Sequence, residues 1–165
     1  MSFIIRKATS QDSEQMGHVH YNAWIETYTG KINNNYLKEL SVRKSVRMFQ
    51  RIKCKNHLVL VIDDNIVGFI GFMKARDEDL NEDYGEIPGM YILKKYHGLG
   101  YGRELLTNAV TKLKEQGFKK IVLWVLDSNN NAISFYEKFG FVFEGKSKDE
   151  ILVTPIRELR YIYRV

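Results

Sequence analysis

The sequence predicts a mixed α/β fold of the α+β class, with one central sheet of about seven strands and about four helices. Runs rich in β-branched residues and bounded by turn residues alternate with segments whose apolar residues recur at helical spacing. The 165 residues contain no internal repeat and no Pro/Gly/Ser-rich linker. Because this length suits one hydrophobic core, residues 1–165 are expected to form a single domain.

The individual elements follow from local patterns. Helices are assigned where a capping residue precedes apolar residues at helical spacing, and they are expected to end at Gly30, Gly117 and Gly140. The run at 119–127 is the most continuously apolar strand, as expected for a strand buried on both faces. A hairpin turn is expected at 63–65, Asp-Asp-Asn. In chain order, the predicted elements are a strand at 3–8, a helix from about 10 to 28, a helical region at 34–53 broken near Ser41, strands at 57–63, 66–75 and 84–93, a helix from about 101 to 116, a strand at 119–127, a short helix at 131–139, and strands at 141–147 and 158–165.

Composition and charge narrow the range of possible functions, partners and locations. The net charge of +5 predicts an anionic partner, which is nucleic acid, an acidic surface or a phosphorylated small molecule. The single cysteine, Cys54, excludes an internal disulfide and fits a reducing compartment. Arg6 and Lys7 interrupt the N-terminal apolar run, so no secretory signal is expected. The longest apolar stretch, at 66–73, is too short to span a bilayer, and a cytoplasmic location without a membrane partner is expected.

The segment KYHGLGYGR at 95–103 places three glycines at alternate positions directly before a predicted helix. A strand, a glycine-rich turn and a helix N-terminus together favour anion binding, because free backbone N–H groups and the helix dipole converge there. The spacing is not that of a P-loop, since Gly102 is followed by Arg103 and Glu104. It also differs from the dinucleotide fingerprint G-x-G-x-x-G. A glycine-rich turn without a ligand is the alternative for this segment alone.

Two longer motifs extend this interpretation. MYILKKYHGLGYGRELL, at 90–106, contains Gly100 and Gly102 preceded by His97, and NNNAISFYEKFGF lies at 129–141. They resemble, in order and spacing, the pyrophosphate-binding motif and the later motif of the GNAT superfamily of acyl-CoA-dependent N-acetyltransferases, although His97 stands where that family usually has Gln or Arg. The resemblance covers nearly the whole chain. It implies a mostly antiparallel, twisted sheet that is splayed between the fourth and fifth strands.

The resemblance implies acetyl-CoA as the cosubstrate, with no metal. A bulge at 88–89, Pro-Gly, would free the N–H groups of Met90 or Tyr91 for the thioester oxygen. Ile92 and Leu93 would line the pantetheine arm. Four lysines, Lys94, Lys95, Lys119 and Lys120, would attract the nucleotide end, or are simply a solvated basic surface. The residues expected to bind the cofactor are Met90, Tyr91, Ile92, His97, Gly98, Leu99, Gly100, Tyr101, Gly102, Arg103, Asn129 and Tyr136.

The same resemblance assigns the catalytic pair. The attacking amine must lose a proton, and Glu86 matches the position of the general base in many family members, with Tyr84 and His20 as reserves. Tyr136 matches the general acid that protonates the departing thiolate. Each has a structural alternative, because Glu86 resembles a surface residue at a strand end and Tyr136 resembles a core tyrosine on a helix face.

The acceptor side is less specific. Trp24 and Tyr28 share a helix face with His20 and are expected to bind the substrate, although an aromatic stripe at this spacing is more often core. The acidic loop at 77–83 either attracts a cationic amine or is a solvated hairpin tip.

The predicted function is acetyl transfer to a primary amine of a polyamine, an amino acid, an amino sugar or a protein. The alternative is a catalytically inactive CoA-binding sensor or interaction module, which the unusual His97 keeps open. Nucleic acid is not expected as a partner, because no cation-rich helix or strand-borne aromatic motif is recognised. A homodimer through late strands such as 158–165 remains open.

Overall fold

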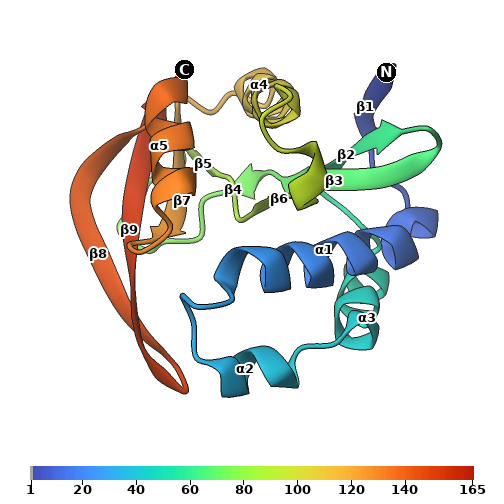
Figure 1. Ribbon diagram of the computed structural model, residues 1–165. Helices are drawn as coiled ribbons and strands as arrows, with labels where there is room; N and C mark the ends of the chain where they lie inside the picture. The colour runs from blue at the N-terminus through green and yellow to red at the C-terminus, as the bar shows by residue number, and fades with distance from the viewer. Residues whose placement is uncertain (1) are drawn as a thin grey trace.

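Nine strands and five α-helices make up residues 2–165, the part of the chain that the computed structural model describes (Figure 1). The helices are α1 (Ser13–Tyr28), α2 (Asn34–Glu39), α3 (Val42–Ile52), α4 (Tyr101–Glu115) and α5 (Asn130–Phe139), with short 3-10 helices at Ser10–Asp12 and Lys94–Tyr96. The strands are β1 (Phe3–Lys7), β2 (His57–Ile62), β3 (Asn65–Gly71), β4 (Met73–Lys74), β5 (Tyr84–Glu86), β6 (Met90–Ile92), β7 (Lys120–Leu126), β8 (Val142–Leu152) and β9 (Thr154–Arg164).

The predicted mixed α/β fold is confirmed, but the strands lie in two sheets rather than one. Four antiparallel strands have the order β1-β2-β3-β6, and five have the order β4-β5-β7-β9-β8, in which β5 and β7 are parallel. The structure has more strands than expected because two predicted strands are each broken in two. The 66–75 segment becomes β3 and β4, and the 84–93 segment becomes β5 and β6, whereas the predicted break near Ser41 is confirmed, since α2 ends at Glu39 and α3 begins at Val42.

Helices cover both faces of the four-stranded sheet (Figure 1). On one face, α4 buries Leu105 and Leu113 in a hydrophobic cluster with β2, β3 and β7, as its predicted apolar stripe requires. On the other face, α1 and α3 bury Met16 and Phe49 against the same two strands, β2 and β3. No helix among the described residues combines the length and the hydropathy that a membrane span requires.

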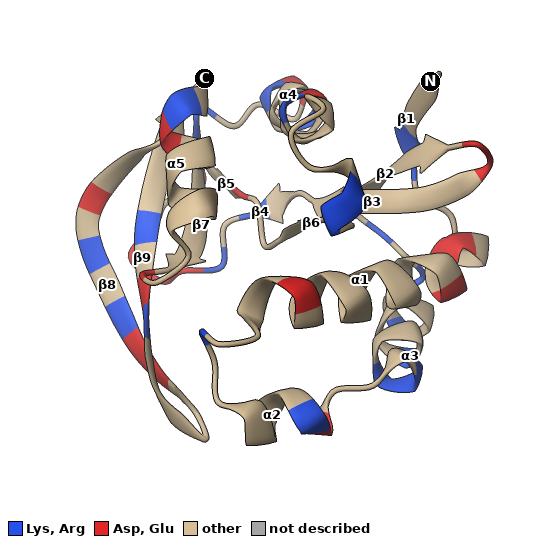
Figure 2. Cartoon of the chain, viewed as in Figure 1, with Lys and Arg blue, Asp and Glu red and all other residues tan. Residues whose placement is uncertain are grey.

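The outer face of α3 is basic. Arg43, Lys44, Arg47 and Arg51 are all exposed there, and Figure 2 shows cations on this helix. The expectation that no helix is cation-rich is therefore wrong. None of these four side chains lines either pocket described below.

The last two strands form a long antiparallel hairpin. β9 pairs with β7 on one edge and with β8 on the other, so both of its edges are occupied. The segment 158–165, which the sequence left open as a dimer edge, is therefore enclosed in the sheet. The free edge of this sheet belongs to β8.

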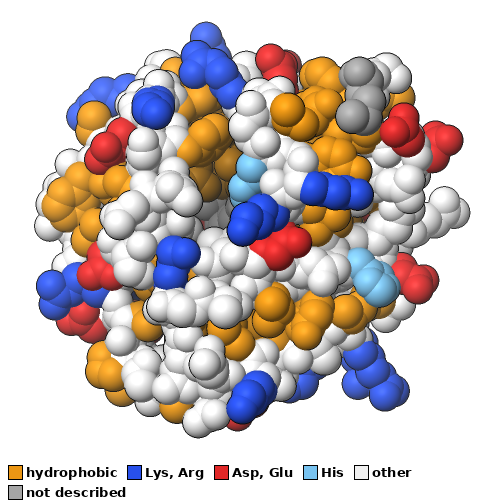
Figure 3. Space-filling view, in the orientation of Figure 1, with side chains coloured by type: hydrophobic (Ala, Val, Ile, Leu, Met, Phe, Trp, Pro, Cys, Tyr) orange, Lys and Arg blue, Asp and Glu red, His pale blue; other side chains and the backbone are white. Residues whose placement is uncertain are grey.

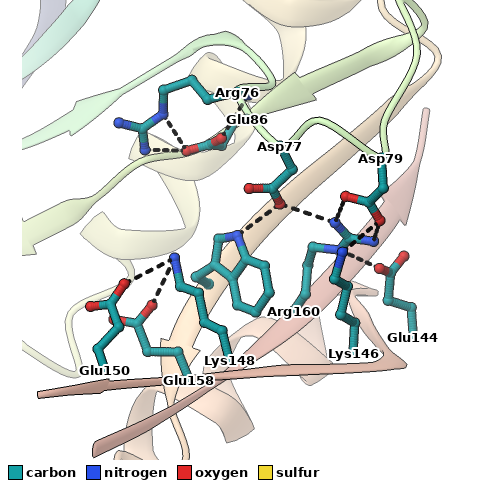
Figure 4. A network of polar contacts seen from close by, with 11 residues as sticks. Arg76, Asp77, Asp79, Glu86, Glu144, Lys146, Lys148, Glu150, Glu158 and Arg160 are labelled. Atoms are coloured by element: carbon teal, nitrogen blue, oxygen red, sulfur yellow. Dashed lines mark hydrogen bonds and ion pairs between the residues drawn. The ribbon is translucent and has the colours of Figure 1, made fainter.

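Arg160 on β9 fixes the loop that joins β4 to β5. Its side chain is only 5% exposed and donates hydrogen bonds to Asp77 at 3.0 Å and to Asp79 at 2.8 and 2.9 Å (Figure 4). It also donates to Glu144 on β8, and Trp124 Nε1 donates to the same Asp77 carboxylate at 2.9 Å. Asp77 and Asp79 are thus held in ion pairs, so this part of the acidic loop is neither a solvated tip nor free to attract an amine.

Replacing Arg160 by leucine is expected to destabilise the protein strongly. The change leaves Asp77 and Glu144 partly buried without their cation, at a cost of about 3 kcal/mol. For a chain of this size the melting temperature should fall by about 6–12 °C in a circular dichroism melt. Arg157→Leu is the matched control, because Arg157 lies on the same strand in an exposed pair with Asp149 and should leave the melting temperature nearly unchanged. Equal shifts in the two variants would contradict this account.

Candidate active site

The segment between β5 and β6 passes from one sheet to the other. Ile87 N–H donates to the Val122 carbonyl of β7 at 3.0 Å, whereas Gly71 N–H of β3 donates to the Gly89 carbonyl at 2.9 Å. Pro88 lies between these two bonds and has no N–H to continue either ladder. The strands β6 and β7 therefore diverge after this point, which is the splay that the sequence predicts.

The open edge of β6 presents the amides of alternate residues. The bond from Leu93 N–H to the Val67 carbonyl, like that between Gly71 and Gly89, marks a hydrogen-bonded pair in the β3–β6 ladder. Such pairs alternate, so Tyr91 also bonds to β3, while the N–H and C=O groups of Met90 and Ile92 face the opening. Of the two amides that the sequence left open as donors, Met90 and Tyr91, only that of Met90 faces the opening.

The glycine-rich loop presents a second set of amides. Gly98 and Gly100 have φ angles of +75° and +86°, and a Cβ atom on either would meet no protein atom within 4 Å. Gly100 is the N-cap of α4, and the first helical bond runs from Glu104 N–H to its carbonyl. The N–H groups of residues 101–103 therefore have no partner within the helix. Together with the helix dipole, this arrangement suits an anion.

His97 does not face these loop amides. Its Nε2 lies 2.7 Å from the Ile92 carbonyl oxygen, so Nε2 carries the proton and donates this hydrogen bond. That carbonyl is one of the groups that face the opening beside β6. The imidazole therefore covers a backbone acceptor on β6, whereas the sequence indicated a donor to phosphate.

A cavity of about 600 Å³, here called the large pocket, joins the β6 edge, the glycine-rich loop and α5. Figure 3 shows this face of the molecule hollowed near its centre. Leu99 and Tyr101 do not line it, because Leu99 is exposed and Tyr101 packs against Phe3 in the core. The expected cofactor-binding residues that do line it are Met90, Tyr91, Ile92, His97, Gly98, Gly100, Gly102, Arg103, Asn129 and Tyr136.

Tyr136 lies on α5, which Asn129 caps through a bond from Ala132 N–H to its side chain. Burial raises the pKa of the Tyr136 phenol above its usual value, and Tyr91 nearby acts in the same direction. No described residue forms a hydrogen bond with the hydroxyl, and the side chain lines the large pocket. The phenol therefore keeps its proton at neutral pH and is free to donate it to a ligand.

A second cavity of about 280 Å³, here called the small pocket, adjoins the first. Glu86 lines it with a side chain that is 2% exposed. Arg76 holds this carboxylate through its backbone N–H at 3.2 Å, its Nε at 3.1 Å and its Nη2 (Figure 4). The bond to Glu86 raises the pKa of the Arg76 guanidinium. A buried carboxylate thus faces the small pocket with its charge balanced by one arginine.

Aromatic side chains form the boundary between the pockets. Tyr28, Tyr91 and Trp124 line both of them, and Trp24 lines the small one. Trp24 packs against Tyr28 at 4.4 Å between ring centroids, and its Nε1 donates to the Tyr91 hydroxyl at 3.2 Å. The predicted substrate residues Trp24 and Tyr28 are therefore brought together with Glu86.

Several other residues that were expected to serve the site lie elsewhere in the structure. His20 packs among Phe49, Phe69 and Tyr91 and lines neither pocket. Tyr84 lies at the start of β5 and lines neither pocket. Lys120 begins β7 and Lys119 precedes it, and neither lines a pocket, whereas Trp124 and Val125 further along the strand line the large pocket. Lys94 does line that pocket.

The sequence gives little sign of other lining residues. Arg76, Lys148, Glu150 and Glu158 line the small pocket, but charges on a strand or loop resemble a solvated surface. Trp124 lies in a run that reads as a fully buried strand. Within residues 2–165, no group of three or more His, Cys, Asp or Glu side chains is placed to hold a metal ion.

Comparison with known proteins agrees with this geometry. The model of the acetyltransferase (GNAT) family matches residues 17–141. An uncharacterized N-acetyltransferase of Bacillus subtilis is 29% identical over 158 residues, covering 94% of this chain and 89% of the relative. A spermidine N(1)-acetyltransferase of Thermoplasma acidophilum is 24% identical over 161 residues, covering 93% and 96% of the two chains.

Solved structures share the fold. An N-acetyltransferase from Thermoplasma acidophilum, in complex with coenzyme A, superposes with a TM-score of 0.82 at 22% identity over the whole of both chains. A putative acetyltransferase from Salmonella typhimurium, with acetyl-CoA, has a TM-score of 0.74 at 16% identity, covering 99% of this chain and 94% of that one.

His20 should make the free energy of unfolding depend on pH. Burial lowers the pKa of this histidine from 6.5 to about 4. Between these pH values the unfolded chain therefore binds a proton at His20, whereas the folded protein does not. Stability is therefore complete above pH 6.5 and falls as the pH drops toward 4. The free energy of unfolding measured in urea should be lower at pH 4.5 than at pH 7, and His20 should account for about 2 kcal/mol of the difference.

The comparison that isolates this histidine is His20→Phe. The variant should lose that share of the pH dependence, whereas exposed His18→Phe should retain all of it. An unchanged pH dependence in His20→Phe would show that His20 is not held neutral by burial.

Proposed function

Because this chain belongs to the acetyltransferase (GNAT) family, we propose that it transfers the acetyl group of acetyl-CoA to a primary amine. The observation that carries the proposal is one cavity that joins three features. The glycine-rich loop with the free amides at the start of α4, the open edge of β6 and the side chain of Tyr136 all line the large pocket. This donor set fits a ligand with a diphosphate at one end and a thioester at the other.

Backbone groups provide most of the hydrogen bonds to the cosubstrate. The amides at the start of α4 bind the diphosphate, and Arg103 adds a positive charge beside them. Ile92 offers its outward N–H to a carbonyl of the pantetheine arm in the manner of a neighbouring strand, whereas its own C=O already accepts from His97. The Met90 N–H points into the same opening and donates to the thioester oxygen as negative charge develops on it.

Acetyl-CoA supplies the acetyl group as a thioester, and the amine forms a C–N bond as the C–S bond breaks. Tyr136, which burial keeps protonated, donates its phenolic proton to the departing thiolate. Glu86 takes the proton that the amine loses. Because Arg76 occupies both oxygens of that carboxylate, the proton reaches Glu86 through a water molecule rather than by direct contact.

The acceptor that we propose is a small alkylamine bound in the small pocket. The volume of about 280 Å³ and the aromatic walls suit an alkyl chain. Two relatives are named for acetylation of spermidine or spermine, one from Thermoplasma acidophilum and one from Bacillus subtilis. An amine of the polyamine type is therefore the first to test.

The direct test is release of coenzyme A thiol from acetyl-CoA across a panel of alkylamines, diamines and amino acids. The proposal requires amine-dependent release together with an acetylated product in the mass spectrum. Thiol release that does not depend on any amine, or none at all, would overturn it.

Tyr136→Phe should lower kcat by about 10²-fold or more, because the thiolate loses its proton donor while the ring remains in place. The KM for acetyl-CoA should change little. Tyr161→Phe is the matched control: this tyrosine is also buried, but its hydroxyl bonds to Glu137 and it lines neither pocket. Equal kcat values for Tyr136→Phe and the wild type would remove the acid role from Tyr136.

Glu86→Gln should lower kcat/KM at neutral pH by about 10²-fold, since the amide cannot accept a proton. The deficit should shrink as the pH approaches the amine pKa of about 10, because the substrate then arrives deprotonated. Glu82→Gln, at an exposed glutamate paired with Lys74, serves as the control. Parallel pH–rate profiles for Glu86→Gln and the wild type would argue against a base at this position.

A further inference from the structure

Lys148 on β8 is held in the small pocket as a bound ammonium group. Its Nζ lies 3.4 Å from a Glu158 carboxylate oxygen and 3.5 Å from one of Glu150 (Figure 4). The same nitrogen lies 4.4 Å from the centroid of the Trp124 ring, within the range of a cation–π contact. Two carboxylates and an indole thus surround one alkylammonium, and all four side chains line the small pocket.

The charges of the small pocket do not balance. Three carboxylates line it, Glu86, Glu150 and Glu158, against the two cations Arg76 and Lys148. Arg76 binds Glu86, which leaves Glu150 and Glu158 to share the single ammonium of Lys148. The excess negative charge therefore lies beside Trp124, separate from the carboxylate proposed as the base.

The side chain of Lys148 is not enclosed. It is partly exposed, and it extends from β8, the edge strand of its sheet. Glu158 is more enclosed, and burial raises the pKa of its carboxyl group, so an additional cation would relieve an unfavourable desolvation there. The second ammonium of a diamine is also an alkylammonium at the end of a flexible chain. It can therefore make the same contacts with Glu158, Glu150 and Trp124 that Lys148 makes.

We propose that Glu158, Glu150 and Trp124 bind the distal ammonium of a diamine or polyamine acceptor, and that Lys148 occupies this subsite until the acceptor displaces it. The inference rests on the proposed acetyl transfer and names the acceptor class and the residues that select it. The reacting amine lies toward Glu86 and the large pocket, while the second ammonium lies against β8 and β9. The opposite possibility, in which Lys148 binds the carboxylate of an amino-acid acceptor, is an outcome of the test.

The test compares 1,4-diaminobutane with butylamine as acceptors and uses the ratio of their kcat/KM values. The wild type should favour the diamine by about 10-fold or more, since the distal ammonium gains a partly buried ion pair. Glu158→Gln should reduce that ratio by about 10-fold, and Lys148→Met should raise it by removing the competing ammonium. Asp149→Asn and Lys146→Met change the same strand outside the pocket and should leave the ratio unchanged.

Calorimetric titration of the coenzyme A complex with 1,4-diaminobutane tests the subsite without turnover. Binding that weakens in Glu158→Gln and tightens in Lys148→Met supports the inference even if no amine is acetylated, a result that would overturn only the proposed function. Acetylation with the same ratio in all variants, or loss of binding in Lys148→Met with amino acids preferred over diamines, would overturn the subsite.

Discussion

The structure depends on the division of one short stretch of backbone between two sheets. β5 completes its hydrogen bonds with β7, and β6 completes its hydrogen bonds with β3, although only residues 87–89 separate them. Pro88 has no N–H group to extend either ladder. Because each strand is bonded to its own sheet, the gap between β6 and β7 stays open and leaves backbone groups of Met90 and Ile92 without a strand partner on that side. Buried backbone groups are nearly always paired, so such groups at an opening suit a ligand with amides of its own.

Tyr136 and Glu86 lie on opposite sides of that opening, in different environments. On the side of α5, burial keeps Tyr136 protonated. On the opposite side, Arg76, which is itself largely exposed, compensates the charge of the buried Glu86 carboxylate. The charged face of the β7-β9-β8 sheet continues this wall, with Trp124 between the ammonium of Lys148 and the guanidinium of Arg160. The network of Arg160 holds the loop before β5 in place, and the network of Lys148 lines the small pocket.

Local patterns predicted the parts of this arrangement that lie in one segment of chain. The glycines before α4, the break at Pro88 and the apolar stripe of α4 each have a local cause in dihedral angles, missing donors or helical spacing. The grouping of Trp124, Lys148 and Glu158 has none, because it arises from the register of β7, β8 and β9. The pairing of Asp77 with Arg160 likewise joins loops and strands far apart in sequence. The direction of the His97 ring depended on which carbonyl of β6 faces outward, which the sequence pattern does not reveal.

Amide hydrogen exchange, resolved by NMR with and without coenzyme A, tests most directly whether the divided strand and the glycine-rich loop form one ligand site. Exchange at Met90, Ile92 and residues 98–103 should slow when the coenzyme is added, while Tyr91, already bonded to β3, should change little. Exchange that stays equally fast at these positions under saturating coenzyme A would contradict the account.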